Sequence, residues 1–191
     1  MLARTEAFRQ GLRELGYAEG ENINIEWRFA EGKVDRLATL VAELIRLKVD
    51  IILSGGPEPT RSAKEATGVI PIVMTQDPDP VGSRFVASLA RPGANITGLS
   101  TLAPELSGKR LELLKEVVPE ISRVAVFGTS TYPGNTRALR ETEFAAEAFG
   151  LKLQYLDVQN RKDIETAFRA AGKGRADAAL WLVAGAIANA R

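Results

Sequence analysis

The 191-residue chain contains no histidine and no cysteine, and this limits the chemistry that its other polar residues can perform. Without imidazole or thiol groups, Ser–His triads, thiolate nucleophiles and the commonest metal ligands are excluded. The informative residues carry hydroxyl, amide or carboxylate groups, or are glycines, and they follow short apolar runs. Such groups can hydrogen-bond a small solute, but they form no nucleophile–base pair. We therefore expect a binding site, with no catalysis, metal or cofactor.

The first candidate binding loop follows a short apolar run. Ser54, Gly55 and Gly56 precede a predicted helix that contains Thr60. The glycines allow backbone N–H groups to approach a ligand, and the start of a helix favours a carboxylate. The hydroxyl of Ser54 or Thr60 can donate a further bond. The alternative is an ordinary strand-to-helix turn, and Glu58 in this loop would repel an anion.

The second candidate loop contains Asp77 and Asp79 within a proline-rich break. A carboxylate at the end of a strand can accept a hydrogen bond from the ammonium or amide group of a ligand. The alternative is that these residues cap a helix that begins near residue 81. We favour the cap for Asp79 and leave both interpretations open for Asp77.

The third candidate loop spans residues 128–135. Tyr132 could stack on an aromatic ligand, while Thr129, Ser130 and Asn135 could hydrogen-bond it. The alternative is a polar connecting loop in which Asn135 is the N-cap of the next helix.

The elements that position these loops alternate regularly along the chain. Strands are expected at residues 23–29, 49–53, 69–74, 95–99, 123–127, 151–158 and 177–183. Helices are expected at residues 2–15, 37–45, 60–67, 83–89, 106–118, 136–149 and 164–171. This alternation predicts an α/β protein with parallel sheets covered by helices. Ligands of such sheets bind beyond the carboxyl ends of the strands, where all three candidate loops lie.

The composition argues against a nucleic-acid partner. The 25 basic residues are balanced by 24 acidic ones, and aromatic residues make up only 6% of the chain. Trp27 and Trp181 fall in predicted strands, where packing is a more common role than ligand stacking.

Residues 95–115 join two α/β halves, which predicts an N-terminal lobe at residues 1–100, a C-terminal lobe at 101–191 and a hinge at 95–101. The first lobe opens with a helix instead of the usual strand, and nothing covers the last strand. We therefore expect a fragment that lacks its first strand and part of its second lobe, although a complete protein with a helical start is the alternative. Unpaired strand edges would favour self-association of such a fragment.

Several strings in the chain resemble one family. They are AFRQGLRELGY at residues 7–17, NINIEW at 22–27, PIVM at 71–74 followed by Asp77, and LARPGANITGLSTLAPELSGKRLELLK at 89–115. Together they resemble the substrate-binding proteins of ABC transporters, in the branch whose characterised members bind aromatic amino acids such as tryptophan. The last string is long enough to be specific.

This resemblance implies a type I periplasmic-binding-protein fold, with two Rossmann-like lobes and a ligand between them. It also implies a periplasmic or extracytoplasmic parent that delivers a small solute to an ABC permease and meets the membrane only indirectly. The rival interpretation is the effector-binding core of a lac-repressor-type regulator, which shares this fold. An enzyme on a Rossmann-like fold would need a cofactor fingerprint or a catalytic constellation, and the sequence shows neither.

Overall fold

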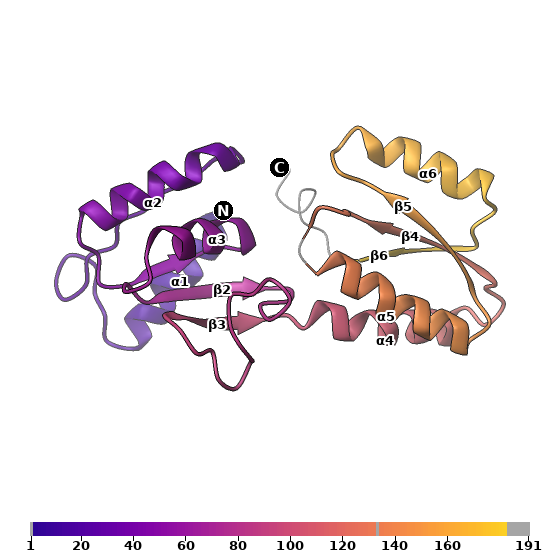
Figure 1. The fold of residues 1–191 in the computed structure, drawn as a ribbon, viewed down its shortest axis with the longest axis horizontal. Coiled ribbons are helices and arrows are strands. Elements are labelled where there is room, and N and C mark those ends of the chain that lie inside the picture. The colour runs from indigo at the N-terminus through magenta and orange to yellow at the C-terminus, as the bar shows by residue number, and fades with distance from the viewer. Residues whose placement is uncertain (1, 133, 183–191) are drawn as a thin grey trace. The chain divides into compact units, whose positions relative to one another are not determined.

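The computed structural model describes residues 2–132 and 134–182, and the chain divides into two compact units between Glu31 and Gly32. Its helices are α1 (Leu2–Glu14), the short 3₁₀ helix η1 (Val34–Arg36), α2 (Leu37–Arg46), α3 (Pro57–Ala66), α4 (Ala103–Val117), α5 (Asn135–Ala148) and α6 (Asp163–Lys173). Its strands are β1 (Ile52–Ser54), β2 (Ile72–Asp77), β3 (Ile96–Ser100), β4 (Arg123–Gly128), β5 (Lys152–Asp157) and β6 (Ala178–Trp181). Figure 1 shows these elements along the chain. None of the helices in the described ranges is long and apolar enough to cross a membrane.

The N-terminal unit consists of α1 and a loop that packs against it. Trp27 lies edge-on to Phe8, with 6.3 Å between ring centroids, and stacks on Phe29 at 6.0 Å. The expected strand at residues 23–29 is wrong, because this segment forms only an isolated bridge between Glu19 and Ile23. A pattern of alternating apolar and polar residues favours an extended conformation, but a strand also requires a hydrogen-bonded neighbour along its length.

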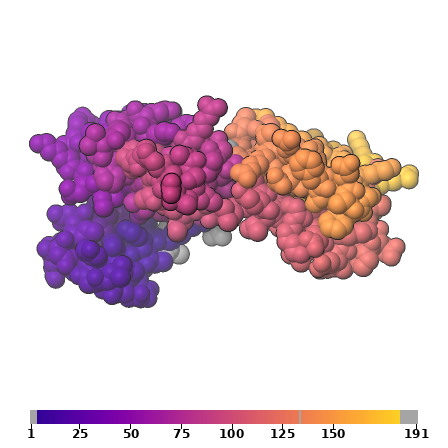
Figure 2. All heavy atoms as spheres, turned by 60° about the horizontal axis from the view of Figure 1, so that its bottom comes forward, coloured from indigo at the N-terminus to yellow at the C-terminus, as the bar shows by residue number. Residues whose placement is uncertain are grey.

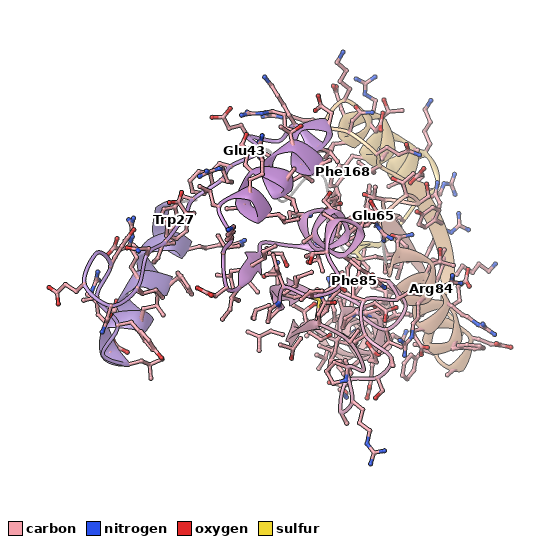
Figure 3. The ribbon with its side chains drawn as sticks, turned by 60° about the vertical axis from the view of Figure 1, so that its left-hand side comes forward. Trp27, Glu43, Glu65, Arg84, Phe85 and Phe168 are labelled. Atoms are coloured by element: carbon pink, nitrogen blue, oxygen red, sulfur yellow. The ribbon has the colours of Figure 1, made fainter. Side chains whose placement is uncertain are left out.

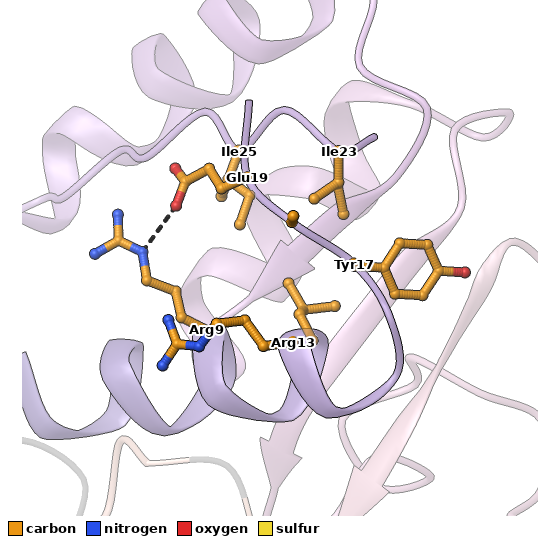
Figure 4. Close-up of a pocket in the computed structure, with 8 residues that line it drawn as sticks. Arg9, Arg13, Tyr17, Glu19, Ile23 and Ile25 are labelled. Carbon is orange, nitrogen blue, oxygen red and sulfur yellow. Dashed lines mark hydrogen bonds and ion pairs between the residues drawn. The ribbon is translucent and has the colours of Figure 1, made fainter. Parts of the chain in front are cut away.

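A pocket of about 260 Å³ lies within this unit. Figure 4 shows Arg9, Tyr17 and Glu19 among its lining residues, with Arg9 Nε 2.9 Å from Glu19 Oε2. The Arg9 guanidinium also lies over the Trp27 ring, 5.1 Å from its centroid. Because the Arg9 guanidinium already has a carboxylate and an aromatic ring as partners, binding a ligand here would add little favourable interaction. None of the residues that line the pocket comes from the three candidate loops.

The second unit contains two parallel sheets, the first in the order β1-β2-β3 and the second in the order β5-β4-β6. In the first sheet, Ile52 pairs with Ile72, and Ile72 pairs with Ile96 on its other side. These apolar side chains share one face and are buried against Val41 of α2 and Ala63 of α3. The prediction of parallel sheets with helical cover is confirmed.

The second sheet is covered on both faces, and β4 alternates between them. Val124 and Val126 belong to a core shared with α4 and α5, whereas Ala125 and Phe127 belong to a core shared with α6. Trp181 stacks on Phe127, with 5.2 Å between ring centroids. Both tryptophans of the chain therefore pack against other aromatic rings, as expected. The predicted end of the last strand at Val183 lies outside the described residues.

The helix expected at residues 83–89 is wrong, because the chain forms a series of turns there. Arg84 has a left-handed backbone with φ of 58°, which cannot continue an α-helix. The next residue, Phe85, is only 2% exposed and belongs to the core of the first sheet. Figure 3 labels both Arg84 and Phe85. Burying this ring takes precedence over the weak helical pattern.

Candidate functional site

The carboxyl ends of β1, β2 and β4 lead into the three predicted loops, as the topology of parallel sheets requires. In the first loop, Gly56 is the N-cap residue of α3 and has a φ of 126°, which favours glycine. Pro57 follows at the first helical position, where the missing N–H is tolerated. Gly55 is exposed, and a Cβ atom on it would meet nothing within 4 Å, so the approach to its backbone is open.

The hydroxyls of this loop point inward. Ser54 and Thr60 are 3% and 0% exposed, and their hydroxyl oxygens lie 2.7 Å apart. Thr60 Oγ1 also donates to the carbonyl oxygen of Gly56 at 2.7 Å. These bonds brace the turn that presents Gly55 and Gly56, so the two hydroxyls support the loop from behind.

Asp77, at the end of β2, is the most unusual group in the site. Its side chain is fully buried, and Oδ1 accepts a hydrogen bond from the Asp79 backbone N–H at 2.8 Å. Oδ2 is also buried, and no donor among the described residues reaches it. Burial raises the pKa of this carboxyl from 3.8 to about 6, the charges of Asp79 and Glu58 add to the rise, and the Asp79 N–H and the Arg61 charge oppose it.

Asp79 behaves as a cap, although not of the predicted helix. Its Oδ1 accepts a bond from the Gly82 N–H at 2.9 Å, and its backbone carbonyl accepts one from Ser83 at 2.8 Å. A Cβ atom on Gly82 would lie 2.1 Å from Asp79 Oδ2, so a side chain at that position would displace the carboxylate that caps the turn. The predicted role of Asp79 as the cap of a helix that begins near residue 81 is wrong, because no helix forms there and Asp79 caps only a single turn.

Tyr132 of the third loop interacts electrostatically with one carboxylate from each of the other two loops. Burial raises the pKa of its hydroxyl to about 12, and the charges of Glu58 and Asp77 contribute to that rise. Tyr132 therefore lies within electrostatic reach of one carboxylate from each of the first two loops. Its half-buried side chain can contact a ligand placed between them.

The other predicted residues of the third loop are braces. Thr129 is 4% exposed and donates to the Val158 carbonyl oxygen at 2.8 Å. Asn135 is not the N-cap of α5, because Gly134 occupies that position. The Asn135 amide instead accepts from the Thr129 N–H at 3.1 Å and donates to the Tyr155 hydroxyl at 3.2 Å.

Ser130 belongs to a polar network around Asp157 that the sequence interpretation missed. Both the N–H and the hydroxyl of Ser130 bond to this carboxylate at 2.8 Å, and Gln159 Nε2 does so at the same distance. The Gln159 bond, followed by the Ser130 N–H, lowers the pKa of Asp157 below its ordinary value. Asp157 ends β5, so the rule that ligands bind at carboxyl ends could have pointed to it.

The three loops thus contain two kinds of residue. Asp77 has a buried oxygen that no donor among the described residues reaches, Tyr132 is half-buried and Gly55 is open, whereas the remaining hydroxyl and amide groups hold the loops in place. The arrangement suits noncovalent recognition of a small solute with a positively charged group, because Asp77 and Glu58 give the site a negative potential.

Comparison with known proteins points in the same direction. A family model described as ABC transporter substrate binding protein matches residues 1–190. A tyrosine-binding protein of Clostridioides difficile is 31% identical over 121 residues, which is 63% of this chain and 34% of that protein.

Solved structures that share the fold include the following two. The ABC domain in complex with L-Trp from Streptococcus pneumonia superposes with a TM-score of 0.82 at 24% identity, over 96% of this chain and 61% of that one. A conserved domain protein from Vibrio cholerae has a TM-score of 0.79 at 29% identity, over 91% of this chain and 59% of that one. The chain therefore spans about a third of the length of the curated relative and about 60% of the structural relatives.

Proposed function

Since the chain belongs to the ABC transporter substrate-binding protein family, we propose that it is part of an extracytoplasmic receptor that captures an amino acid and delivers it to the permease of an ABC importer. The solute would lie at the carboxyl ends of the two sheets, between the loops that carry Asp77 and Tyr132. Binding would involve no covalent step.

The observation that carries this proposal is the unpartnered Oδ2 of Asp77. A buried carboxylate oxygen without a donor is unfavourable, and an ammonium group supplies both the missing hydrogen bond and the opposite charge. The negative charge of Glu58 supports the same preference for a cationic group.

The rest of an amino acid also finds complementary groups in this site. The start of α3 supplies a positive helix end and the Glu58 N–H for the α-carboxylate, with the exposed Gly55 beside it as an open stretch of backbone. Pro57 and Pro59 have no N–H, and the Thr60 N–H bonds to the Gly56 carbonyl oxygen at 3.1 Å. Tyr132 supplies a ring for stacking on an aromatic side chain. That the relatives include a tyrosine-binding protein and a complex with L-Trp supports an aromatic amino acid as the solute.

Closure around the solute would occur at the connection between β3 and α4. Leu102 there has a left-handed backbone with φ of 48°, an uncommon conformation for leucine. Its neighbour Thr101 donates its N–H to the Asp77 carbonyl oxygen at 3.0 Å. The proposed hinge between lobes 1–100 and 101–191 is thus bonded directly to a ligand-binding residue, so a solute held by Asp77 would bias its position.

Calorimetric titration with L-tryptophan and L-tyrosine tests the proposal. We expect saturable binding of at least one of them, and a loss of at least about 30-fold in affinity for Asp77→Asn, because removing one partner of a buried charge pair costs several kcal/mol. Asp50→Asn, which changes an exposed carboxylate, serves as the matched control.

Indole-3-propionate, which lacks the amine of tryptophan, should bind neither the original chain nor the variant. Equal affinity for indole-3-propionate and L-tryptophan would contradict the role of Asp77, and the absence of binding by every amino acid would contradict the proposed function.

A further inference from the structure

Arg137, in the first turn of α5, contacts carboxylates from two other segments. Its Nη1 lies 3.2 Å from Asp79 Oδ1, in the loop after β2, and its Nη2 lies 2.9 Å from Glu105 Oε1, in the first turn of α4. The Asp79 side chain is only 5% exposed, whereas that of Arg137 is 44% exposed. A single guanidinium therefore joins a loop of the first sheet to two helices that cover the second sheet.

The backbone around this contact is closely packed. Gly134 has a φ of 79°, and a Cβ atom on it would lie 3.2 Å from Asp79 Cβ and 3.5 Å from Pro104 Cγ. The Ala103 N–H donates to the Pro78 carbonyl oxygen at 3.3 Å. Figure 2 shows the corresponding magenta and orange regions adjoining at the surface. The loop after β2, the start of α4 and the start of α5 thus meet at one point.

Asp79 connects this junction with the binding site. Its Oδ1 accepts bonds from both Arg137 and the Gly82 N–H, while its backbone N–H donates to Asp77 Oδ1. Through Asp79, the guanidinium is linked to the carboxyl group whose other oxygen has no partner.

The energetics favour a strong link at this position. A carboxylate as buried as that of Asp79 requires a compensating charge, and Arg137 supplies it with the directional fork of a guanidinium. Asp79 and Glu105 also lie near the positive N-terminal ends of α5 and α4 respectively, which adds to the attraction.

We propose that Arg137 is a positioning residue that clasps the loop after β2 to the start of α5, and thereby holds both the two sheets and the Asp77 carboxyl in the geometry of the site. We call Arg137, Asp79 and Glu105 the Arg137 clasp. The clasp acts through Asp79 and does not depend on which solute the site binds, so it can be tested separately from the proposed function.

The first measurement is the distance between the two sheets. Because the chain has no cysteine, spin labels can be attached at Glu65→Cys on α3 and Thr166→Cys on α6 without removing any native thiol. Double electron–electron resonance should give a broader distance distribution for Arg137→Met than for the original chain. Arg140→Met, one turn further along α5, is the matched control and should leave the distribution unchanged.

The second measurement is the titration of Asp77, followed by NMR of labelled carboxyl carbons. In Arg137→Met the midpoint should move upward from about 6, because the Asp79 N–H that favours the ionised form is less firmly held. The groups that act on Asp77 include Asp79, Glu58 and Arg61, and the substitution changes none of these three residues.

Arg137→Lys should restore both properties only in part, because one ammonium group cannot reproduce the two-sided contact of the guanidinium. The proposal is overturned if Arg137→Met keeps either the original distance distribution or the original Asp77 midpoint, or if Arg140→Met produces the same changes.

Discussion

At the scale of single residues, the site depends on an imbalance at Asp77. Its two carboxylate oxygens are equally buried, yet only Oδ1 has a hydrogen-bond donor. The hydroxyls of Ser54, Thr60 and Thr129 lie at similar loop positions, but each is bonded within the protein. An ammonium group on a ligand would therefore supply a hydrogen bond that Asp77 lacks, whereas these hydroxyls already have partners.

This imbalance predicts how stability depends on pH. The folded-state pKa of Asp77, about 6, exceeds its unfolded value of 3.8, so the folded protein binds this proton more tightly. The resulting stabilisation is complete below about pH 4 and is lost as the pH rises through 6. The difference between the two pKa values makes the folded protein about 3 kcal/mol less stable at neutral pH than below pH 4.

Asp77→Asn should remove this dependence. At pH 7.5 we expect the free energy of unfolding to rise by about 1–2 kcal/mol, because the penalty of the buried charge exceeds that of an unpartnered amide group. Urea unfolding between pH 4.5 and 7.5 measures the effect, with Asp50→Asn as control. A variant that retains the original pH slope would show that Asp77 is not its source.

At the scale of elements, the pairing of β2 with β3 places Asp77 in the site. Met74 pairs with Gly98, but the register shifts before Asp77 pairs with Ser100. At Gly98, φ is 144° and a Cβ atom would lie 2.2 Å from the Met74 carbonyl oxygen. Only glycine allows the strands to approach this closely just before the irregularity.

Gly98→Ala should therefore lower the free energy of unfolding by at least about 2 kcal/mol, through backbone strain and the clash with β2. The matched control is Gly172→Ala in α6, where a Cβ atom meets nothing within 4 Å. That change should be neutral or stabilising by up to about 1 kcal/mol, because alanine favours a helix. Chemical denaturation compares the two variants, and equal stabilities would refute the assigned role of Gly98.

At the scale of the whole molecule, β1 forms one edge of the first sheet among the described residues. Ile51 and Leu53 at this edge are 59% and 42% exposed. An apolar strand edge of this kind provides backbone groups and side chains to which another chain can add. The self-association expected from the sequence remains a prediction, and this edge is the part of the structure that supports it.

Ile51→Lys should reduce such association, because a charged residue at a strand edge disfavours pairing with a second chain. Val69→Lys is the control: Val69 is 87% exposed, lies outside the strands and receives the same change of charge. Sedimentation velocity over a range of protein concentrations should show less oligomer only for Ile51→Lys. A monomeric original chain at all concentrations would contradict the prediction.

Much of the architecture follows from sequence patterns, because helices and parallel strands depend on local periodicity. The segments now seen as α2, α4, α5, α6 and the six strands were all expected, with small differences at their ends. The failures at residues 23–29 and 83–89 share a cause. In both segments the local pattern was favourable but tertiary interactions decided the outcome. Residues 23–29 have no neighbouring strand among the described residues to pair with along their length. At residues 83–89, the left-handed backbone of Arg84 that accompanies the burial of Phe85 cannot continue a helix.

The sequence by itself determined the α/β class, the family and the three loops, because apolar periodicity, glycines and the string at residues 89–115 are local features. Only the tertiary structure decided which side chains the loops present. Alternation from Ile72 and Met74 would place Asp77 on the opposite face, yet the shift in register turns it into the core. Arg137 showed no distinguishing pattern, since its role comes from two carboxylates that folding brings together from distant positions.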